Sequence, residues 1–452
     1  MINTLITIGP RTLNKEDISE FKKHSKLFRL NGSHNTIAWH SGAIKLIREQ
    51  CPEAFILIDI PGIKPRTANT ENILIEKGQE VCFGDGANTS GILNVRLTKT
   101  LPNYDNSLEN FSVNDGQYLF DVSNIGTGFI EGISREKFQL LPKKGINIPN
   151  SIYDEEMQFS IYKKFITQIK DLDIDALGLS FVQTGELVTK IRSLRSDLVL
   201  ISKIENSEGL KNCNEISTAA DAVMIDRGDL VAEIGYQNLY AGIETISRMA
   251  KAQGKPLIMA TENLETMINR ELPSKSEVVS LSHSAHLGVD CFMLSEETAV
   301  SEKAQTTVRW LADFLNNLPI IKHIPQDEII KHDNNLDIWS GVQTYSGLPA
   351  LIMSKSGRAI SRYLALQPNT ELFLMTNSER VLKSSLLYSR KVTPIKVEMH
   401  DVPNIELLWE MIDMYKKEIF REYDKIVAIY VSKYVKTPRA NTITIFNKSD
   451  FY

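Results

Sequence analysis

The 452-residue chain has little cysteine, no long apolar stretch and only a small excess of negative charge. Its four cysteines are scattered, and none forms a C-x-x-C pair or has zinc-ligand spacing, so we expect four reduced thiols in a cytosolic protein. No apolar run approaches the roughly 18 residues that span a bilayer, and no secretory signal is recognisable. A net charge of −5 gives no general attraction to nucleic acid or to anionic membranes.

What the sequence does contain is a regular alternation of short apolar runs with amphipathic stretches. Buried parallel strands are typically continuous apolar runs, and their alternation with helices indicates βαβ units. Eight runs fit such strands: Thr4–Ile8, Leu27–Leu30, Phe55–Asp59, Ala176–Phe181, Leu198–Ile204, Ala222–Ile225, Pro256–Ala260 and Asp290–Leu294. The amphipathic stretches predict helices at Lys15–His24, Thr36–Arg48, Ser151–Lys170, Gly185–Leu194, Leu210–Thr218, Leu239–Gln253, Lys275–His286 and Lys303–Asn316. Eight such units in one chain predict a closed (β/α)8 TIM barrel.

Two other parts of the chain do not follow this alternation. More than 100 residues separate Asp59 from Ala176, far more than a βα connection needs. Alternating apolar runs and turn sequences predict an inserted β-rich lid domain, a small β-barrel, at 68–145. A C-terminal α/β domain is expected at 336–452. The catalytic barrel would then comprise 1–67 and 146–318.

Charged residues stand at the ends of two predicted barrel strands, where β/α barrels carry their chemistry. Lys203 and Glu205 are two residues apart on the fifth strand, so both side chains point to one face. Asp229 follows the sixth strand. Two carboxylates on neighbouring strands suit Mg²⁺, which favours one or two carboxylates together with substrate oxygens and water. On spacing alone, an internal ion-pair network of these residues is an equally good interpretation.

The same residues lie in segments that resemble pyruvate kinases. The segment 199–210 contains the Lys-Ile-Glu-Asn core of the active-site segment of that family. Further similar segments, in matching order, are Thr7–Pro10, Arg29–His34, Asp59–Thr67, Lys143–Asn147, Arg227–Leu230, Ala260–Thr261, Leu264–Glu265 and Leu294–Ala299. The resemblance implies a barrel with an inserted β domain and a C-terminal α/β domain. It also implies a phosphotransferase that converts phosphoenolpyruvate and ADP to pyruvate and ATP, the last step of glycolysis.

The resemblance implies a role for each matched residue. The catalytic residues would be Lys203, Arg29 and Thr261, and Mg²⁺ would be held by Glu205 and Asp229. Phosphoenolpyruvate would contact Arg29, Lys203, Arg227, Gly228, Asp229 and Thr261. The nucleotide would contact Asn31, His34, Arg66 and Lys144.

A monovalent-cation site is implied as well, with Asn31, Ser33, Asp59 and the backbone of Ile60 as ligands. Lys64 stands where K⁺-dependent members of the family carry Glu. A fixed ammonium can replace the charge of a bound K⁺, so we expect K⁺ to be dispensable. The alternative is that Lys64 is a solvated loop lysine.

The C-terminal region contains one further motif. The residues Ser354, Lys355, Ser356, Gly357 and Arg358 resemble the loop by which many pyruvate kinases bind a sugar-phosphate effector. A Ser/Gly loop that opens a helix suits a phosphate, although it could equally be a capped turn without a ligand. A homotetramer is expected by analogy with the family.

Several residues around the predicted site depart from the family pattern. They are Asp226, Gln183, Glu262 and Glu296, whereas Lys203, Glu205 and Asp229 are retained. Two functions therefore remain open. The first is an active pyruvate kinase. The second is a diverged, non-glycolytic paralogue that binds phosphoenolpyruvate or a related keto or enol acid with little or no kinase activity.

Overall fold

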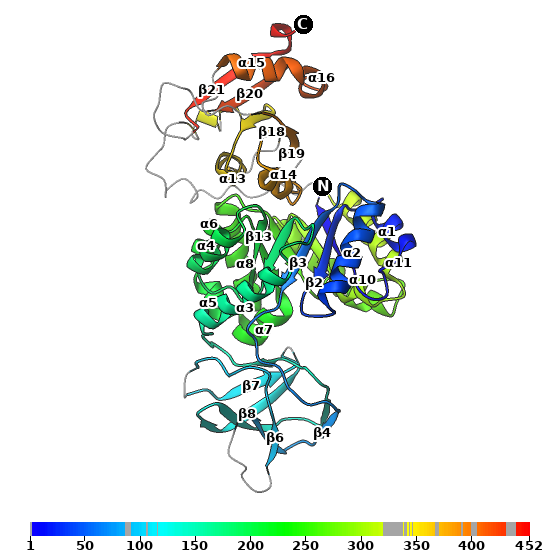
Figure 1. Cartoon of the computed structure of the whole chain (residues 1–452), viewed down its shortest axis with the longest axis vertical. Helices are drawn as coiled ribbons and strands as arrows, with labels where there is room; N and C mark the ends of the chain where they lie inside the picture. Colours follow the sequence, from blue (N-terminus) through cyan, green and yellow to red (C-terminus); the bar gives the residue numbers. More distant parts are fainter. Residues whose placement is uncertain are drawn as a thin grey trace.

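The computed structural model consists of three bodies stacked along one axis (Figure 1). The structure describes residues 2–85, 92–104, 107–114, 116–319, 338, 341–342, 344–345, 347–366, 370–389, 392–398, 405–430 and 440–452. A β/α barrel forms the middle body. A β-rich region lies at one end of it and a small α/β region at the other. Among the described residues, no helix is both long and apolar enough to cross a membrane.

The middle body is a closed barrel of eight parallel strands. They are β1 (Asn3–Thr7), β2 (Leu27–Asn31), β3 (Phe55–Ile60), β12 (Ala176–Leu179), β13 (Val199–Ile204), β14 (Ala222–Asp226), β15 (Leu257–Ala260) and β16 (Cys291–Leu294). They are paired in the order β1-β16-β15-β14-β13-β12-β3-β2. Each strand corresponds to one of the eight predicted apolar runs, and nearly every residue in them is buried, as a parallel sheet covered by helices requires. The predicted TIM-barrel fold class is confirmed.

Helices surround this barrel. They are α1 (Lys15–Phe21), α2 (Ile37–Gln50), α3 (Glu155–Gln168), α4 (Gly185–Leu194), α5 (Ser207–Lys211), α6 (Cys213–Ala219), α7 (Arg227–Ile234), α8 (Tyr236–Ala252), η1 (Glu265–Ile268), α9 (Lys275–His286), α10 (Glu296–Ala299) and α11 (Ala304–Asn317). The predicted helix at Leu210–Thr218 is wrong in one respect, because it is divided at Asn212 into α5 and α6. The Nδ2 of Asn212 donates to the carbonyl of Gln183 at 2.9 Å, which holds the break in place.

The inserted region is built from β4 (Ile73–Ile75), β5 (Glu80–Gly84), β6 (Leu93–Val95), β7 (Asn110–Val113), β8 (Tyr118–Gly126), β9 (Phe129–Ser134), β10 (Phe138–Leu140) and β11 (Ile146–Asn147). Six strands form one sheet in the order β11-β7-β8-β9-β5-β6, and β10 pairs with β4. Phe83, Phe111 and Phe120 pack its core with ring centroids 5.2–5.6 Å apart. Strand β11 pairs with β7 in this sheet, although it lies beyond residue 145, where the inserted domain is predicted to end. The predicted domain boundary therefore stays a proposal.

The C-terminal region is a five-stranded sheet in the order β19-β18-β17-β20-β21, of which only β21 is antiparallel. Its elements are β17 (Ala350–Met353), α13 (Arg358–Ala365), β18 (Leu372–Thr376), α14 (Glu379–Ser385), β19 (Val392–Lys396), α15 (Ile405–Met414), α16 (Lys416–Ile419), β20 (Lys425–Tyr430), β21 (Thr442–Asn447) and η3 (Lys448–Asp450). The segment that would link this region to the barrel, 320–337, lies outside the described residues.

The residues that follow α14 close the barrel at the N-terminal ends of its strands. Leu387 is fully buried in one cluster with barrel-interior residues such as Leu5 and Met224. Beside it, Asp290 accepts hydrogen bonds from the backbone N–H and the hydroxyl of Ser389, at 3.0 and 2.7 Å. The C-terminal region therefore covers the floor of the barrel, and a site would lie at the opposite end, on the side of the inserted β region.

Candidate active site

The acidic residues singled out in the sequence meet at the C-terminal ends of the barrel strands, on the side of the inserted β region (Figure 1). Glu205 directly follows β13, Asp226 ends β14, and Asp229 lies in the first turn of α7. One carboxylate oxygen from each of these three residues lies within 4.8 Å of the other two. The barrel topology thus brings together side chains that the chain supplies from separate strand ends.

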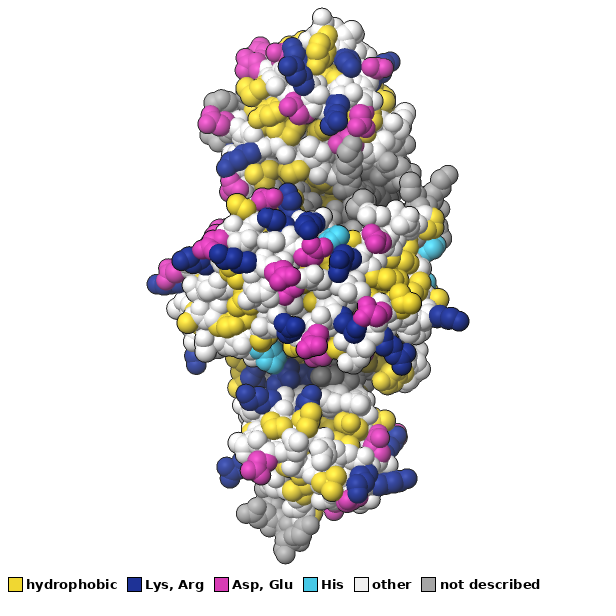
Figure 2. Space-filling model, turned by 90° about the vertical axis from the view of Figure 1, so that its right-hand side faces the viewer, with side chains coloured by type: hydrophobic (Ala, Val, Ile, Leu, Met, Phe, Trp, Pro, Cys, Tyr) yellow, Lys and Arg dark blue, Asp and Glu magenta, His cyan; other side chains and the backbone are white. Residues whose placement is uncertain are grey.

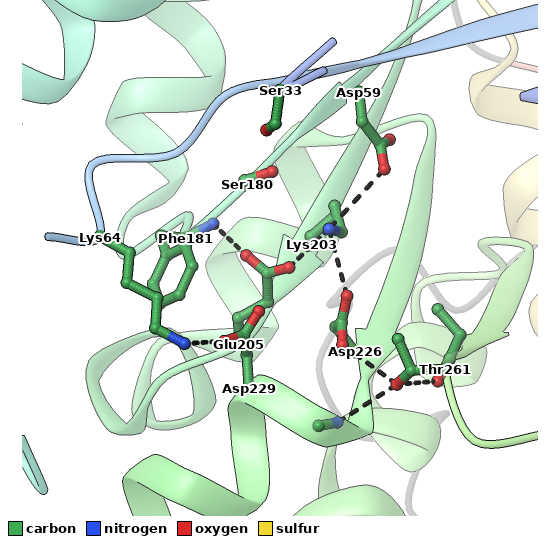
Figure 3. A network of polar contacts seen from close by, with 12 residues as sticks. Ser33, Asp59, Lys64, Ser180, Phe181, Lys203, Glu205, Asp226, Asp229 and Thr261 are labelled. Atoms are coloured by element: carbon green, nitrogen blue, oxygen red, sulfur yellow. Dashed lines mark hydrogen bonds and ion pairs between the residues drawn. The ribbon is translucent and has the colours of Figure 1, made fainter. Parts of the chain in front are cut away.

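The ammonium of Lys203 lies among carboxylates, as Figure 3 shows. Its Nζ is 2.6 Å from Glu205, 3.2 Å from Asp226 and 3.7 Å from Asp59. Burial alone would lower the pKa of Lys203, but these three carboxylates outweigh it and raise the pKa well above its ordinary value. The lysine therefore stays charged. The ion-pair network that spacing allowed is present, and it occupies the mouth of the barrel.

Arg29 is fixed by the same group of acids. Its Nε and Nη2 lie 2.8 and 2.7 Å from Oδ2 of Asp59, and its Nη1 donates to the hydroxyl of Thr7 at 3.1 Å. Burial raises the pKa of Asp59, but the charges of Arg29 and Lys203 outweigh burial and lower it overall. Gly178 makes room for this carboxylate, since an ideal Cβ there would lie 1.9 Å from Oδ1 of Asp59.

Glu205 is fully buried, and its Oε2 accepts a hydrogen bond from the backbone N–H of Phe181 at 2.6 Å. Burial raises its pKa to about 8, against the effect of Lys203, and the neighbouring charges of Asp226 and Asp229 act in the same direction as burial. Crowded carboxylates of this kind repel one another until a cation lies between them. Because the donors are carboxylate oxygens, the set fits Mg²⁺, and Glu205 and Asp229 could hold it.

Lys64 is buried rather than solvated, so the interpretation as a loop lysine in solvent is wrong. Its side chain is 3% exposed, and its Nζ lies 2.5 Å from Oδ1 of Asp229. The Nζ also lies 5.9 Å from the ring centroid of Phe181. Figure 3 shows the ammonium turned toward Asp229 and away from Ser33. The lysine thus neutralises one of the two carboxylates that could hold Mg²⁺.

Thr261 lies directly after β15 in an unusual backbone conformation. Thr261 and Glu262 have φ values of +59° and +52°, which side-chain-bearing residues rarely adopt in succession. The Oγ1 of Thr261 lies 3.1 Å from Oδ1 of Asp226 and accepts the backbone N–H of Gly228 at 3.2 Å. Strained residues persist where surrounding contacts determine them, and they are frequent at active sites.

Arg227 holds this strained loop. Its guanidinium donates to the carbonyl of Thr261, to Asn263 Oδ1 at 3.0 Å and to the Ser280 hydroxyl at 2.8 Å. The side chain is buried. Substrate contact by Arg227 therefore stays a prediction, whereas its described bonds go to the loop after β15.

Glu233 is a buried acid that the sequence analysis did not single out. It lies on α7, four residues after Asp229, and is fully buried. The hydroxyls of Ser151 and Tyr153 lie 3.3 and 3.4 Å from its carboxylate oxygens. Burial raises its pKa to about 8, and the charge of Lys64 opposes that rise. The sequence feature that could have identified Glu233 is its spacing of four residues from Asp229, because helix residues i and i+4 share a face.

The predicted nucleotide and monovalent-cation ligands lie around the rim. After β2, Oδ1 of Asn31 accepts the backbone N–H of Ser33 at 3.0 Å, and His34 is exposed. Partial shielding of its imidazole ring from water, followed by the charges of Arg66 and Arg29, lowers the pKa of His34. The carbonyl of Ile60 accepts a hydrogen bond from the hydroxyl of Ser180 at 2.9 Å.

A basic surface lies where the barrel meets the inserted region, and Figure 2 shows Lys and Arg side chains gathered at this waist. Two neighbouring chain segments cross it, joined by a bridge between Arg66 and Gly145. Nη1 of Arg66 donates to the carbonyl of Lys143 at 3.1 Å, and the backbone N–H of Lys144 donates to Thr67. A basic waist beside the barrel mouth suits the phosphates of a nucleotide.

The departures from the family pattern have different surroundings. Gln183 is buried, and its side-chain amide makes two 2.9 Å hydrogen bonds with the backbone of Tyr153, which gives it a structural role. Glu296 is exposed in the first turn of α10, and its charge acts on His34. Asp226 alone joins the acidic group at the barrel mouth.

The effector-like loop opens helix α13. Gly357 has φ +85°, and its N–H donates to the hydroxyl of Ser354 at 3.1 Å. The N–H of Arg358 lies 3.4 Å from the hydroxyl of Ser356, and the side chains of Lys355 and Arg358 are exposed. The loop is thus a capped turn with basic residues outward, and a ligand on it stays a prediction.

Comparison with known proteins gives matches over two thirds of the chain or more. The family described as pyruvate kinase, barrel domain, matches residues 2–308. A pyruvate kinase of Encephalitozoon cuniculi is 30% identical over 68% of this chain and 72% of that protein. One of Thermococcus litoralis is 27% identical over 98% and 97%. The crystal structure of pyruvate kinase from Pyrobaculum aerophilum shares the fold, with a TM-score of 0.77 at 21% identity and coverage of 99% and 98%.

Proposed function

The chain belongs to the pyruvate kinase family, and on that premise we propose that it transfers the phosphoryl group of phosphoenolpyruvate to ADP, giving pyruvate and ATP. One observation carries the proposal. A charged, buried lysine, Lys203, lies at the barrel mouth within 2.6 Å of Glu205, beside a carboxylate group that fits a divalent cation. Phosphoryl transfer depends chiefly on positioning and charge neutralisation, which such a set supplies.

Each part of the site would contribute one element of this reaction. The Lys203 ammonium and the Arg29 guanidinium would neutralise the transferring phosphoryl group and the developing enolate. Glu205 and Asp229 would hold Mg²⁺, which would supply further neutralisation of negative charge. The first turn of α7, at Gly228, would receive the substrate carboxylate through backbone N–H groups.

The Thr261 hydroxyl would then serve the second half of the reaction. It is held between the carboxylate of Asp226 and the N–H of Gly228. A hydroxyl fixed in this way would lie beside the enolate carbon at which the proton is added. Asn31, His34, Arg66 and Lys144 would bind the nucleotide at the basic rim. The proposal extends to the final step of glycolysis in the cytoplasm, a homotetramer, and a sugar-phosphate effector on Ser354–Arg358.

A second candidate function rests on Asp226. Its carboxylate lies 3.2 Å from Lys203 and 3.1 Å from Thr261, so it adds negative charge where an anionic substrate would bind. That charge favours a diverged paralogue which binds phosphoenolpyruvate or a related acid and transfers little phosphate. Both candidate functions include binding of phosphoenolpyruvate or a related acid, but only the first includes substantial phosphoryl transfer.

The experiment is a coupled assay of pyruvate formation from phosphoenolpyruvate and ADP with Mg²⁺. Lys203→Met should reduce turnover by at least about 100-fold. Lys211→Met, at a lysine whose side chain is 73% exposed, serves as the matched control and should have no effect. A folded native protein without turnover, whose melting temperature phosphoenolpyruvate still raises, would favour the paralogue.

The same assay tests the expectation that K⁺ is dispensable. We expect turnover to persist when K⁺ is replaced by tetramethylammonium, because the buried ammonium of Lys64 supplies a fixed positive charge near the acidic group. A rate that collapses after this replacement would contradict the expectation.

A further inference from the structure

The residues of β14 that face the barrel interior end in a carboxylate. Ala222 and Met224 lie in the apolar cluster inside the barrel, and Asp226, two residues further along the strand, points to the same side. Its side chain is 9% exposed. A buried carboxylate at this position needs polar partners. It is also one of the positions at which the sequence departs from the family pattern.

The neighbouring strands supply these partners. In the barrel, β14 lies between β13, which carries Lys203, and β15, which is followed by Thr261. Oδ2 of Asp226 lies 3.2 Å from Nζ of Lys203, and Oδ1 lies 3.1 Å from Oγ1 of Thr261. Figure 3 shows the carboxylate between these two side chains. The two oxygens of one carboxylate thus bridge an ammonium and a hydroxyl that come from the strands on either side.

The contact with Lys203 matters most when a cation binds at Glu205. Lys203 lies against three acids, with Nζ 2.6 Å from Glu205, 3.2 Å from Asp226 and 3.7 Å from Asp59. The proposed function assigns Glu205 to Mg²⁺, and Oδ2 of Asp59 accepts a hydrogen bond from Nε of Arg29 at 2.8 Å. Asp226 can therefore hold the ammonium in place while Glu205 binds the cation.

The contact with Thr261 orients a hydroxyl that has a choice of acceptors. Oγ1 of Thr261 accepts the backbone N–H of Gly228 at 3.2 Å. Its own proton can go to Oδ1 of Asp226 at 3.1 Å or to the carbonyl of Ala260 at 2.7 Å. Hydrogen bonds to an ionised acceptor are stronger than those to a neutral one. Asp226 therefore draws the hydroxyl proton toward the side of Lys203.

We propose that Asp226 is a positioning residue that holds the Lys203 ammonium and the Thr261 hydroxyl at a fixed separation through its two carboxylate oxygens. The inference deepens the proposed function and rests on it, because that function places Lys203 at the transferring phosphoryl group and Thr261 beside the enolate carbon. The negative charge of Asp226 opposes binding of an anionic substrate. Asp226 thus favours turnover over tight binding of phosphoenolpyruvate.

The test applies the coupled assay to Asp226→Asn, which keeps the shape of the side chain but offers one acceptor oxygen in place of two. The kcat should fall at least about tenfold. The KM for phosphoenolpyruvate should stay unchanged or fall, because a negative charge beside the anion is lost. Phosphoenolpyruvate should raise the melting temperature of the variant at least as much as that of the native chain. Asp171→Asn, at an exposed aspartate, is the matched control and should change neither constant.

A second background separates positioning from general support of the barrel. In Thr261→Val no hydroxyl remains to be oriented, so the fold-loss of kcat caused by Asp226→Asn should be at least about three times smaller than in the native chain. An equal loss in both backgrounds would overturn the inference. A higher KM together with a lost melting shift would overturn it too, because it would indicate a merely structural role.

Two further outcomes concern the proposed function. A kcat that is unchanged or higher in Asp226→Asn would overturn the inference, and a higher one would favour the paralogue whose turnover this charge suppresses. A native chain without turnover would overturn the proposed function itself. That failure is visible before any variant is made, so the two failures are distinguishable.

Discussion

Replacing Glu233 with Gln should stabilise the metal-free protein, and by more as the pH rises. The pKa of Glu233 is raised from an ordinary value of 4.5 to about 8, chiefly by burial. Between these two values the folded protein keeps a proton that the unfolded chain has lost. Stability therefore falls as the pH increases through this interval. An amide cannot ionise, so the variant avoids this loss.

The magnitude follows from the two pKa values. At about 1.4 kcal/mol per pH unit, the full difference between 4.5 and about 8 corresponds to roughly 5 kcal/mol above pH 8. Near pH 7 the cost of the native carboxyl group is about 3 kcal/mol, and near pH 5 it is about 1 kcal/mol. Glu233→Gln should gain these amounts, less whatever its amide loses in hydrogen bonding to Ser151 and Tyr153.

The assay is chemical denaturation of the native chain and Glu233→Gln at pH 5, 7 and 9, with EDTA present. Glu302→Gln, at an exposed glutamate, is the matched control and should show no comparable trend. A stability difference that stays constant across this range would refute the reasoning. So would a variant that is less stable than the native chain at pH 9.

Two further substitutions test the geometry. Gly178→Ala should lower turnover at least about tenfold, because a Cβ 1.9 Å from Asp59 Oδ1 must displace that carboxylate. Gly42→Ala, where an added Cβ meets nothing within 4 Å, should leave turnover unchanged, and equal activity of the two variants would contradict this. Leu387→Ala should lower the free energy of unfolding by about 2–5 kcal/mol in denaturant titrations. Met414→Ala, at a residue 72% exposed, should change it by less than about 0.5 kcal/mol.

Much of the fold could be predicted because the barrel strands are buried on both sides and read as continuous apolar runs. The predicted strand bounds lie close to the observed ones. Strands β15 and β16, for example, begin one residue later than expected. The resemblance to pyruvate kinases implies a short helix that opens at Arg227, Gly228 and Asp229, and α7 begins there, but the apolar pattern alone does not indicate it. Its first residues, Arg227, Gly228 and Asp229, are polar or small and show no apolar periodicity. The start of the helix can therefore be located only once β14 is known to end at Asp226.

The residues of the candidate site could be predicted from the sequence, but most of the contacts between them could not. Lys203 and Glu205 are close in sequence, and their common face follows from strand geometry. Lys64 and Asp229 are 165 residues apart, and their contact depends on closure of the barrel, which spacing cannot reveal. Burial of Glu233 likewise depends on Ser151 and Tyr153, which lie before α3 and come from a different part of the chain.

Leu387 makes the C-terminal region part of the packing of the barrel. The residue fills the floor of the barrel from a part of the chain that is synthesised after every barrel strand is complete. A barrel cut off after α11 would expose Leu5 and Met224 at an open end and leave Asp290 without its bonds to Ser389. The part of the chain that carries the candidate site therefore has an incompletely packed floor until the last sheet forms. Its stability therefore depends in part on residues at the end of the molecule farthest from the candidate site.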